Sequence, residues 1–362
     1  MKNKIIFFHL YNNYSGSPRV LLDVISVLKN QYDITLITSK TEGVLNNIDV
    51  KKKLIPYNWT KNKILTLFKF IYAQLCFVFY AFFLAKKDTI FYINTQQPSV
   101  VGLVGKLLNV PVVFHVHESS SSQKYFGKFY RLIRKYVNGN EIFVSQFIKE
   151  IEEINKDKSQ VIYNATSKII FKESFNHKYN PIKNGVFNVL MICSLRDYKG
   201  IPELFRIATL LLNDEKIKFK LVVDASEEDI EEYLNLIIKP KNITIYSRTS
   251  TPELYFKQSS LVLNLSRVDQ WIETFGLTIL EAISFGVPCI VPPVGGPIEI
   301  IDDGVNGYCI SSYDVDIIAS KIKELSRDSK KCEQLSKEAK IKSEFFSQKK
   351  FKIHILEFLN NK

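Results

Sequence analysis

The sequence predicts an α/β protein made of two doubly wound parallel-sheet domains. Short apolar runs alternate with amphipathic helical segments along the chain, which is the pattern of parallel strands joined by helices. The chain has 362 residues, enough for two domains of roughly 150 to 200 residues each. Periodicity fails between residues 168 and 185, so we expect an interdomain linker there.

The N-terminal half begins with a buried strand at 5–10, a loop that holds Gly16, and a helix at 19–30. This loop lacks G-x-G-x-x-G spacing, which argues against a dinucleotide enzyme. Gly16 would allow a ligand to approach the backbone closely, or it belongs to an ordinary strand-to-helix turn. We predict further strands at 33–38, 89–93, 110–117, 141–144 and 161–163, and helices at 99–108 and 146–154, the second capped by Ser145.

Residues 64–85 form the most apolar segment of the chain, and its 22 residues are long enough to cross a bilayer. Lysines bracket it at positions 61, 63, 86 and 87. Three interpretations are open: a helix packed on the sheet, a helix that also dips into the membrane interface, and a span. The first is favoured because Lys69 and Gln74 interrupt the segment and a strand follows at once.

Polar residues follow the strand predicted at 110–117. It ends in His115-Val116-His117-Glu118, with four serines after it. Ligand sites in open parallel sheets lie beyond the carboxyl ends of strands, so this end is placed for chemistry. Strand alternation would turn one histidine into the core and leave the other at the edge. No third ligand with metal-site spacing accompanies them, so we expect no metal.

The second sheet begins with a strand at 186–193, and the loop after it carries Arg196 and Lys199. A guanidinium and an ammonium at such a strand end suit a diphosphate, although a solvated turn is the alternative. We predict helices at 201–212, 229–237, 251–259 and 351–359, strands at 220–223, 243–246, 261–265 and 288–291, an edge strand after the turn at 302–307, and a charged amphipathic region at 321–342.

The stretch from Glu273 to Glu299 carries the strongest chemical signal. Glu273 lies in a turn, and Glu281 lies inside a helix that opens at Gly276 and closes at Gly286. The unpaired amides at the start of that helix, together with its dipole, favour an anion such as phosphate. The two carboxylates would accept hydrogen bonds from hydroxyl groups on either side. A phosphate site between hydroxyl-binding carboxylates indicates a nucleotide sugar.

The formal charge of +12 and the pI near 9.2 favour a polyanionic partner: nucleic acid, an anionic membrane surface or a phosphorylated substrate. The lysines are scattered and form no compact basic motif, so we expect no nucleic-acid binding. Five widely spaced cysteines indicate reduced thiols in a cytosolic protein. The N-terminus runs straight into a strand pattern, so we expect no signal peptide.

The glutamate pair, Gly286-Val287-Pro288 and Gly295-Gly296-Pro297 resemble glycosyltransferase family 4. The resemblance extends to Gly16, the His-x-His-Glu strand end, Ser145-Gln146-Phe147, Tyr163-Asn164, residues 196–200 and residues 303–307. It implies the GT-B fold, in which two Rossmann-like domains face each other across a cleft. It places an acceptor-binding domain at 1–175, a nucleotide-sugar-binding domain at 186–345, and a C-terminal helix at 346–362 that returns to the N-terminal domain.

The resemblance also implies roles for single residues. Glu273 would contact the donor sugar hydroxyls and Glu281 the ribose hydroxyls. The amides of Phe275, Gly276 and Leu277, with the Lys199 ammonium, would bind the diphosphate. This chain has Cys193-Ser194-Leu195 where the family more often has Gly-Arg-Leu, so Arg196 would replace that arginine. Gly16 would border the diphosphate and acceptor, and one histidine of the pair, with His115 preferred over His117, would contact the transferred sugar. Residues around Gln270, Trp271 and 94–97 would set specificity.

The implied activity is that of a metal-independent, anomer-retaining hexosyl- or related glycosyltransferase that needs no cofactor. Its acceptor would be a glycan or a polyprenyl-diphosphate-linked glycan in capsule, O-antigen or exopolysaccharide synthesis. The basic charge and the apolar segment at 64–85 add a peripheral position on the inner face of the cytoplasmic membrane. The alternatives are a GT-B sugar-nucleotide epimerase and a catalytically silent subunit that binds nucleotide sugars.

Overall fold

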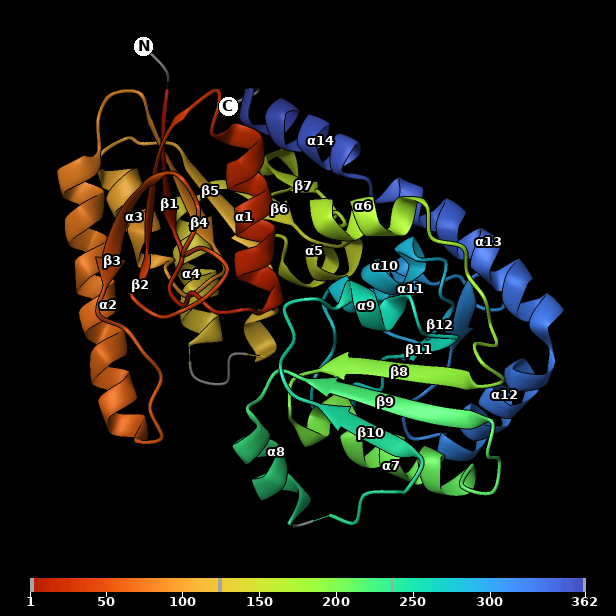
Figure 1. Ribbon diagram of the computed structural model, residues 1–362. Coiled ribbons are helices and arrows are strands. Elements are labelled where there is room, and N and C mark those ends of the chain that lie inside the picture. The colour runs from red at the N-terminus through yellow and green to blue at the C-terminus, as the bar shows by residue number, and fades with distance from the viewer. Residues whose placement is uncertain (1–2, 123–125, 236, 361–362) are drawn as a thin grey trace. The chain divides into compact units, whose positions relative to one another are not determined.

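The computed structural model describes residues 3–122, 126–235 and 237–360. The chain divides into two compact units, one made of Met1–Asn164 with Lys349–Lys362 and the other of Ala165–Gln348. Each unit is built around one parallel sheet (Figure 1), so the predicted fold class is confirmed. The predicted linker is corrected, because Lys168–Phe175 forms helix α6 inside the second unit. Ser167 caps this helix by accepting a hydrogen bond from the Ile170 amide.

The first unit has a seven-stranded sheet in the order β3-β2-β1-β4-β5-β6-β7. The order changes direction between β1 and β4, and ligands of open α/β sheets bind at such a switch point. Pairing there aligns Phe8 with Ile93, and on the next pair Asn94 with His115. The strands are β1 (Lys4–Phe8), β2 (Asp33–Ser39), β3 (Lys51–Ile55), β4 (Thr89–Asn94), β5 (Val112–Val116), β6 (Asn140–Phe143) and β7 (Ser159–Val161).

Two elements of the first unit were not predicted from the sequence. β3 carries three exposed lysines, which do not alternate with apolar residues, and it pairs only at the edge of the sheet. Helix α4 (Gly127–Val137) is rich in basic residues and follows the serine run. α1 also begins earlier than predicted, at Gly16. The other helices are α1 (Gly16–Leu28), α2 (Lys63–Leu84), α3 (Val100–Leu107), α5 (Gln146–Glu152) and α14 (Gln348–Asn360), with 3₁₀ turns η1 (Ser120–Ser122) and η2 (Lys156–Lys158).

The apolar segment forms the predicted helix, α2 (Lys63–Leu84), which Asn62 caps by accepting from the Ile64 and Leu65 amides. Its fully buried side chains are Ala73, Phe77 and Ala81, which pack into the core under the sheet. By length and composition the helix could cross a membrane, and only 17% of its most apolar window is buried. The helix is therefore packed on the sheet, as predicted, but only along one narrow stripe of its surface.

The second unit has a six-stranded parallel sheet in the order β10-β9-β8-β11-β12-β13. β8 stands between β9 and β11, so the chain again reverses its winding direction there, and the loops after β8 and β11 meet at the switch point. The strands are β8 (Phe187–Cys193), β9 (Ile217–Val223), β10 (Ile243–Tyr246), β11 (Leu261–Leu263), β12 (Cys289–Val291) and β13 (Gly307–Cys309).

Helices cover the second sheet and close its core. Leucine and isoleucine side chains of α7 and α12 pack in the same buried cluster as the central strands. The helices are α7 (Ile201–Leu210), α8 (Glu227–Leu234), α9 (Glu253–Phe256), α10 (Leu277–Ser284), α11 (Pro297–Ile300), α12 (Val315–Arg327) and α13 (Ser329–Phe345), with a 3₁₀ turn η3 (Asp197–Lys199). The predicted elements of this half are present, with α9 shorter than expected. Position 236 of the helix predicted at 229–237 and positions 361–362 of the C-terminal segment lie outside the described residues.

Candidate active site

The second unit joins a cation and a carboxylate at the switch point of its sheet. Lys199 ends the loop after β8, and Glu273 lies in the loop after β11. The Lys199 ammonium donates to Glu273 Oε1, and both side chains are largely buried. The Ser266 hydroxyl donates to the same oxygen at 3.1 Å. Two residues that lie 74 positions apart in the sequence thus form one charged pair.

Lys199 favours the ionised form of Glu273. Burial raises the pKa of Glu273, but the charge and hydrogen bond of Lys199 and the hydrogen bond of Ser266 oppose it, and the pKa lies below its usual value. Burial also raises the pKa of the neighbouring Cys193 thiol, to about 12. The thiol is therefore neutral, and Glu273 is the ionised acceptor at neutral pH.

Aromatic rings line the same place. The Lys199 ammonium lies 4.9 Å from the centre of the Trp271 ring, and the Tyr198 and Trp271 rings stack at 5.6 Å. A cation held over an indole face is further stabilised by the ring electrons. Trp271, which the sequence suggested for specificity, is thus a neighbour of the charged pair.

Glycines let two loops approach each other here. Gly276 has φ +103°, a conformation that other residues rarely adopt, and it directly precedes α10. The Gly296 amide donates to the Glu273 carbonyl at 2.8 Å. A Cβ at Gly296 would lie 2.4 Å from the Phe275 Cα, so this contact requires glycine. The Gly295-Gly296 turn after β12 therefore positions the Glu273 loop.

The start of α10 directly follows the Glu273 loop. No side chain of the described residues caps its first turn, so amides there are left to an outside acceptor. Phe275 is buried beneath the turn, and Leu277 is the first helical residue. Glu281 lies in the second turn and is almost fully buried. The structure thus gathers Glu273, Gly276 and Lys199 around one helix start.

Arg196 does not join this group. It is exposed at the beginning of η3, whereas the described ion pair of this loop is that of Lys199. The sequence patterns missed another cation, Arg267, whose guanidinium bonds the nearly buried Glu203 at 2.8 Å and whose amide donates to the Tyr198 carbonyl. Ser266 and Arg267 follow the predicted strand at 261–265 directly, which is the signal that would have identified them.

The first unit builds a polar group at its own switch point, between β1 and β4. Asn94 ends β4 and bridges three partners: its Nδ2 lies 3.0 Å from His9 Nδ1 and 3.2 Å from the Ser17 carbonyl, and its Oδ1 lies 2.9 Å from His117 Nε2. Ser17 is in the first turn of α1, next to Gly16. The predicted residues Gly16 and His117 are therefore neighbours through Asn94.

His115 is placed differently from His117. It is fully buried, its Nδ1 lies 2.9 Å from the Tyr92 hydroxyl, and its Nε2 is a buried nitrogen that lacks a partner among the described residues. Burial lowers the pKa of His115 to about 3 and that of His9 to about 4, and it also lowers the pKa of His117. The three rings are neutral at physiological pH.

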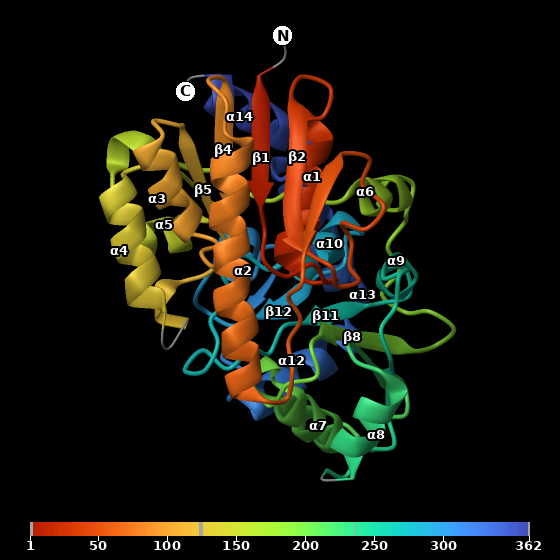
Figure 2. The same cartoon turned by 90° about the vertical axis from the view of Figure 1, so that its left-hand side faces the viewer.

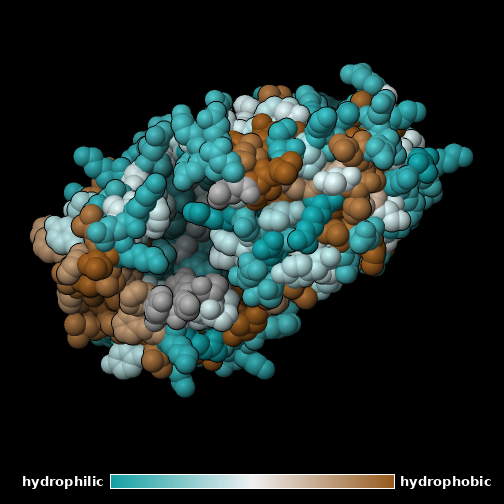
Figure 3. All heavy atoms as spheres, turned by 90° about the horizontal axis from the view of Figure 1, so that it is seen from below, coloured by the Kyte–Doolittle hydropathy of each residue, from teal (hydrophilic) through white to brown (hydrophobic). Residues whose placement is uncertain are grey.

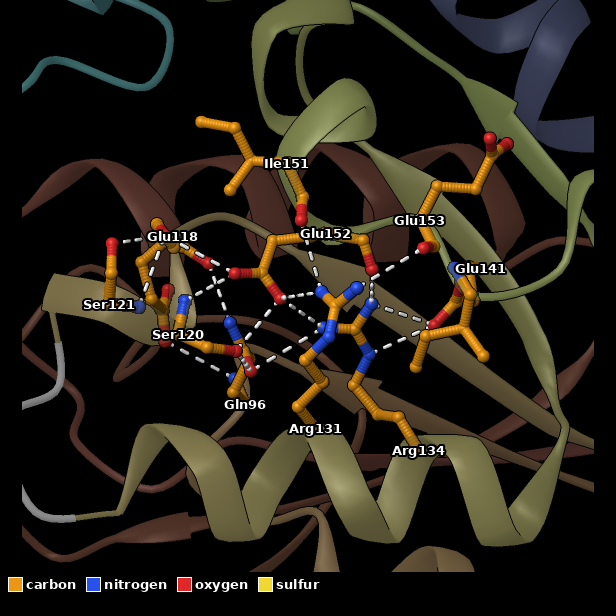
Figure 4. Close-up of polar contacts among 12 residues, drawn as sticks. Gln96, Glu118, Ser120, Ser121, Arg131, Arg134, Glu141, Ile151, Glu152 and Glu153 are labelled. Carbon is orange, nitrogen blue, oxygen red and sulfur yellow. Dashed lines mark hydrogen bonds and ion pairs between the residues drawn. The ribbon is translucent and has the colours of Figure 1, made fainter.

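A buried ion network fixes the loop that follows the histidine strand (Figure 4). Glu152 of α5 accepts from the Ser120 amide at 2.6 Å and from the Ser120 hydroxyl at 2.8 Å. Arg134 of α4 bonds Glu152 at 2.9 Å and Glu141 at 2.8 Å, and all three charged side chains are buried. The network therefore connects α4, α5 and β6 to the end of β5. Within the described part of the chain, no group of three or more His, Cys, Asp or Glu could hold a metal ion.

A family model described as glycosyl transferases group 1 matches residues 172–342, nearly the whole second unit and both members of the charged pair. The match covers just under half of the chain. The resemblance seen in the sequence is confirmed, and the chain carries a glycosyltransferase domain.

Curated relatives match about half of the chain. An N-acetyl-alpha-D-glucosaminyl L-malate synthase of Bacillus anthracis is 29% identical over 184 residues, which cover 49% of this chain and 47% of the relative. An uncharacterized 41.2 kDa protein in the cps region of Klebsiella pneumoniae is 28% identical over 179 residues, 48% of this chain and 46% of that protein. The matches thus span about half the length of these relatives.

A solved structure is similar over nearly the whole chain. Anabaena HepE in complex with UDP and glucose has a TM-score of 0.77 at 18% identity, and the match covers 99% of each chain. At this identity the likeness concerns the fold, which is the GT-B fold of two parallel-sheet units. The prediction of that fold class is confirmed.

Proposed function

We propose that this protein is a retaining glycosyltransferase that moves a sugar from a nucleotide-diphosphate sugar to a glycan or lipid-linked acceptor in cell-surface polysaccharide synthesis. The observation that carries the proposal is the Lys199–Glu273 pair beside the uncapped start of α10. The matched family domain supports transfer as the reaction class. The position of the Klebsiella relative in a cps region supports a role in surface polysaccharide.

The second unit would bind the donor. Lys199 and the amides of Phe275, Gly276 and Leu277 would bind the diphosphate, because a point charge and a helix start both stabilise anions. Glu273 would accept from the sugar hydroxyls and Glu281 from the ribose hydroxyls. Arg196, exposed at the loop edge, would reach the diphosphate from solvent. UDP sugars are the first donors to test, since HepE was solved with UDP and glucose.

The charges of the site suggest the reaction path. As the bond from the anomeric carbon to the phosphate oxygen breaks, negative charge grows on the diphosphate, where Lys199 and the α10 amides stabilise it. The acceptor oxygen bonds to the anomeric carbon on the face that the phosphate leaves, and the acceptor proton passes to the phosphate oxygen. This route retains the anomeric configuration and requires neither a cofactor nor a metal ion.

Of the two predicted histidines, His117 is the better placed to meet the transferred sugar. It lies at the strand end beside Asn94 and the first turn of α1, with Gly16 nearby, whereas His115 is fully enclosed against Tyr92. A neutral His117 whose Nε2 faces Asn94 would have Nδ1 left for a sugar hydroxyl. His115 would then support the ring of His117, whose centre is 4.2 Å away.

We further propose that the protein works in the cytoplasm, on the inner face of the membrane, with an anionic membrane surface as a partner and no nucleic acid. The formal charge of +12 supports this position. A lipid-linked acceptor would be presented at the same surface.

Transfer from a panel of nucleotide sugars to lipid-linked acceptors, followed by NMR of the product, tests the function. Lys199→Ala and Glu273→Ala should each slow transfer about 10²- to 10³-fold, as loss of charge stabilisation does. Lys321→Ala, which removes a partly exposed lysine paired with Glu324, is the control. Wild-type rates in both site variants would refute the assignment. A changed donor sugar without acceptor would indicate an epimerase.

A further inference from the structure

The outer face of α2 is apolar, although it faces away from the core. Phe68, Tyr72, Leu75, Phe79 and Phe83 recur at helical spacing, and each is 55% to 75% exposed. The buried stripe of Ala73, Phe77 and Ala81 lies on the opposite side of the helix. A surface helix in water normally carries charges on its outer face. A face of large apolar side chains in their place marks an interaction surface.

Neighbouring helices extend this surface. α2 packs beside α3, and α3 beside α4, as Figure 2 shows. Phe126, just before α4, lies against Phe70 of α2 with ring centres 5.4 Å apart. On α4, Phe129, Leu132 and Tyr136 are exposed. Figure 3 shows hydrophobic side chains gathered at the left-hand end of the molecule, where Figure 1 has α2.

Positive charge lies at both ends of the apolar face. Lys61 and Lys63 flank the start of α2, and Lys86 and Lys87 follow its end. At that end a hollow of about 780 Å³ is lined by six lysines (Lys4, Lys51, Lys52, Lys53, Lys86 and Lys87) and by two aspartates, Asp33 and Asp88. Lys4 donates to the Leu84 carbonyl at 3.0 Å, so the cluster touches the last turn of the helix. The surface is therefore apolar in the middle and cationic at both ends.

This arrangement fits a helix lying in a bilayer interface better than one crossing it. The stripe at Ala73, Phe77 and Ala81 belongs to the core cluster of the sheet, and the central strand β4 begins at Thr89, soon after the helix ends. To cross the bilayer, α2 would have to leave that core. With the axis in the membrane plane, the outward rings enter the acyl boundary while the lysines at both ends meet phosphate groups.

We propose that the outer face of α2, extended by the exposed side of α4 and by the lysine cluster at its end, is a docking surface for an anionic lipid bilayer. The partner is the membrane surface itself, and the helix lies in its plane. This inference deepens the membrane position proposed above. It is tested without donor or acceptor, so its failure would leave the transferase proposal standing.

Flotation with vesicles tests the surface. Full-length protein should bind vesicles of roughly 70% phosphatidylcholine and 30% phosphatidylglycerol far more tightly than pure phosphatidylcholine, and about 0.5 M salt should weaken the binding. The variant with Phe68, Leu75, Phe79 and Phe83 changed to serine should lose affinity about tenfold or more. Its control changes the exposed Leu210, Ile317, Ile341 and Phe345 of the second unit to serine. Equal loss in both variants, or unchanged binding in the first, would overturn the proposal.

The lysines are tested separately, because these exposed side chains can be changed without disturbing the core. Changing Lys51, Lys52, Lys86 and Lys87 to glutamine should lower affinity for anionic vesicles about tenfold. The same change at the exposed Lys216, Lys218, Lys330 and Lys337 is the control. Loss of equal size in the control would mean that overall charge, and not this cluster, binds the membrane, which contradicts the proposal.

Trp59 reports how deeply the surface enters. It is 60% exposed shortly before α2, and Trp271→Phe leaves it as the single tryptophan. Brominated lipid in anionic vesicles should quench its fluorescence, and alkaline carbonate should release the bound protein. Resistance to carbonate would indicate a membrane span.

Sedimentation without lipid tests whether a second copy of the chain covers the face instead. The face would be assigned to a second copy if the protein forms a dimer that the serine variant of α2 abolishes, and if the wild type does not bind vesicles. Either result would overturn the proposal.

Discussion

Lys199 and Glu273 form a largely buried ion pair that joins the loop after β8 to the loop before α10. Because both loops leave neighbouring central strands at their carboxyl ends, the sheet order brings the residues together. A diphosphate bound at α10 would share the Lys199 ammonium with Glu273. On the proposed assignment, the pair would couple the binding of the phosphate to the position of the carboxylate.

This coupling predicts that substitution of Lys199 mainly weakens UDP binding, whereas substitution of Glu273 mainly slows sugar transfer. Lys199→Ala should weaken UDP binding about 10- to 100-fold, because a charge-assisted contact is lost. Glu273→Gln should leave UDP affinity within about fivefold, since it removes the negative charge that competes with the phosphate for Lys199, but it should slow transfer about 10²-fold. Calorimetry with UDP and initial rates give the two quantities. An equal loss of UDP affinity in both variants would contradict the assigned roles.

Gly296→Ala should disturb the Glu273 loop. The added Cβ would meet the Phe275 Cα and the Thr274 carbonyl at 2.4 Å, so the turn must move, at a cost of about 1–3 kcal/mol. Donor affinity should fall with it. Gly304→Ala is the control for backbone strain alone, because Gly304 has φ +73° and open space around it, so UDP affinity should stay unchanged. Urea unfolding and UDP titration measure both effects, and unchanged UDP affinity in Gly296→Ala would show that the turn does not position the site.

Arg134→Met should destabilise the first unit strongly. It leaves Glu141 buried without its guanidinium partner and leaves Glu152 with only the half-exposed Arg131 at 3.3 Å, which costs about 3–5 kcal/mol. Arg131→Met, at a half-exposed position on the same helix, should cost about 1 kcal/mol or less. Denaturant unfolding followed by circular dichroism compares the two. Similar losses in both variants would mean that the buried network of Figure 4 contributes little.

The buried histidines predict acid sensitivity. Burial lowers the pKa of His9 to about 4, so the unfolded chain binds its proton more readily, and the stability that a neutral His9 contributes is lost as the pH falls from about 6.5 toward 4. Between about pH 7 and pH 5 the free energy of unfolding should fall by roughly 2 kcal/mol for His9 alone. Urea unfolding at several pH values measures this.

His9→Gln is the control for that experiment. The variant should lose part of the pH dependence, because glutamine does not titrate, while Asn94 and its other neighbours remain. Activity between about pH 6 and 8 should show no step from these histidines, since their pKa values lie below that range. A pH profile identical to that of the wild type would remove His9 from the explanation.

The sequence by itself determined the parts that depend on local patterns. Apolar runs and helix periodicity identified the central strands, such as the one at Phe187–Cys193, because a buried parallel strand is apolar nearly throughout. Gly276 and Gly286 marked the ends of α10, since both adopt positive φ. The cations in the loop after a predicted strand indicated Lys199, and the turn before a helix that opens at Gly276 indicated Glu273. Strand β3 was not predicted because its lysines give no apolar pattern. The linker prediction was wrong because a short polar helix resembles a loop in sequence.

Only the tertiary structure decided which of these residues meet. Spacing along the chain does not show that Lys199 contacts Glu273 while Arg196 stays outside the pair. It also does not show that His117 lies beside Asn94, whereas His115 lies against Tyr92. Strand order and loop packing decide these contacts, because they bring distant strand ends to one edge of the sheet. The same holds for α2. Its composition fits a core helix, a helix at a membrane interface or a membrane span. The structure shows that only a narrow stripe of the helix contacts the sheet, so an apolar face stays uncovered.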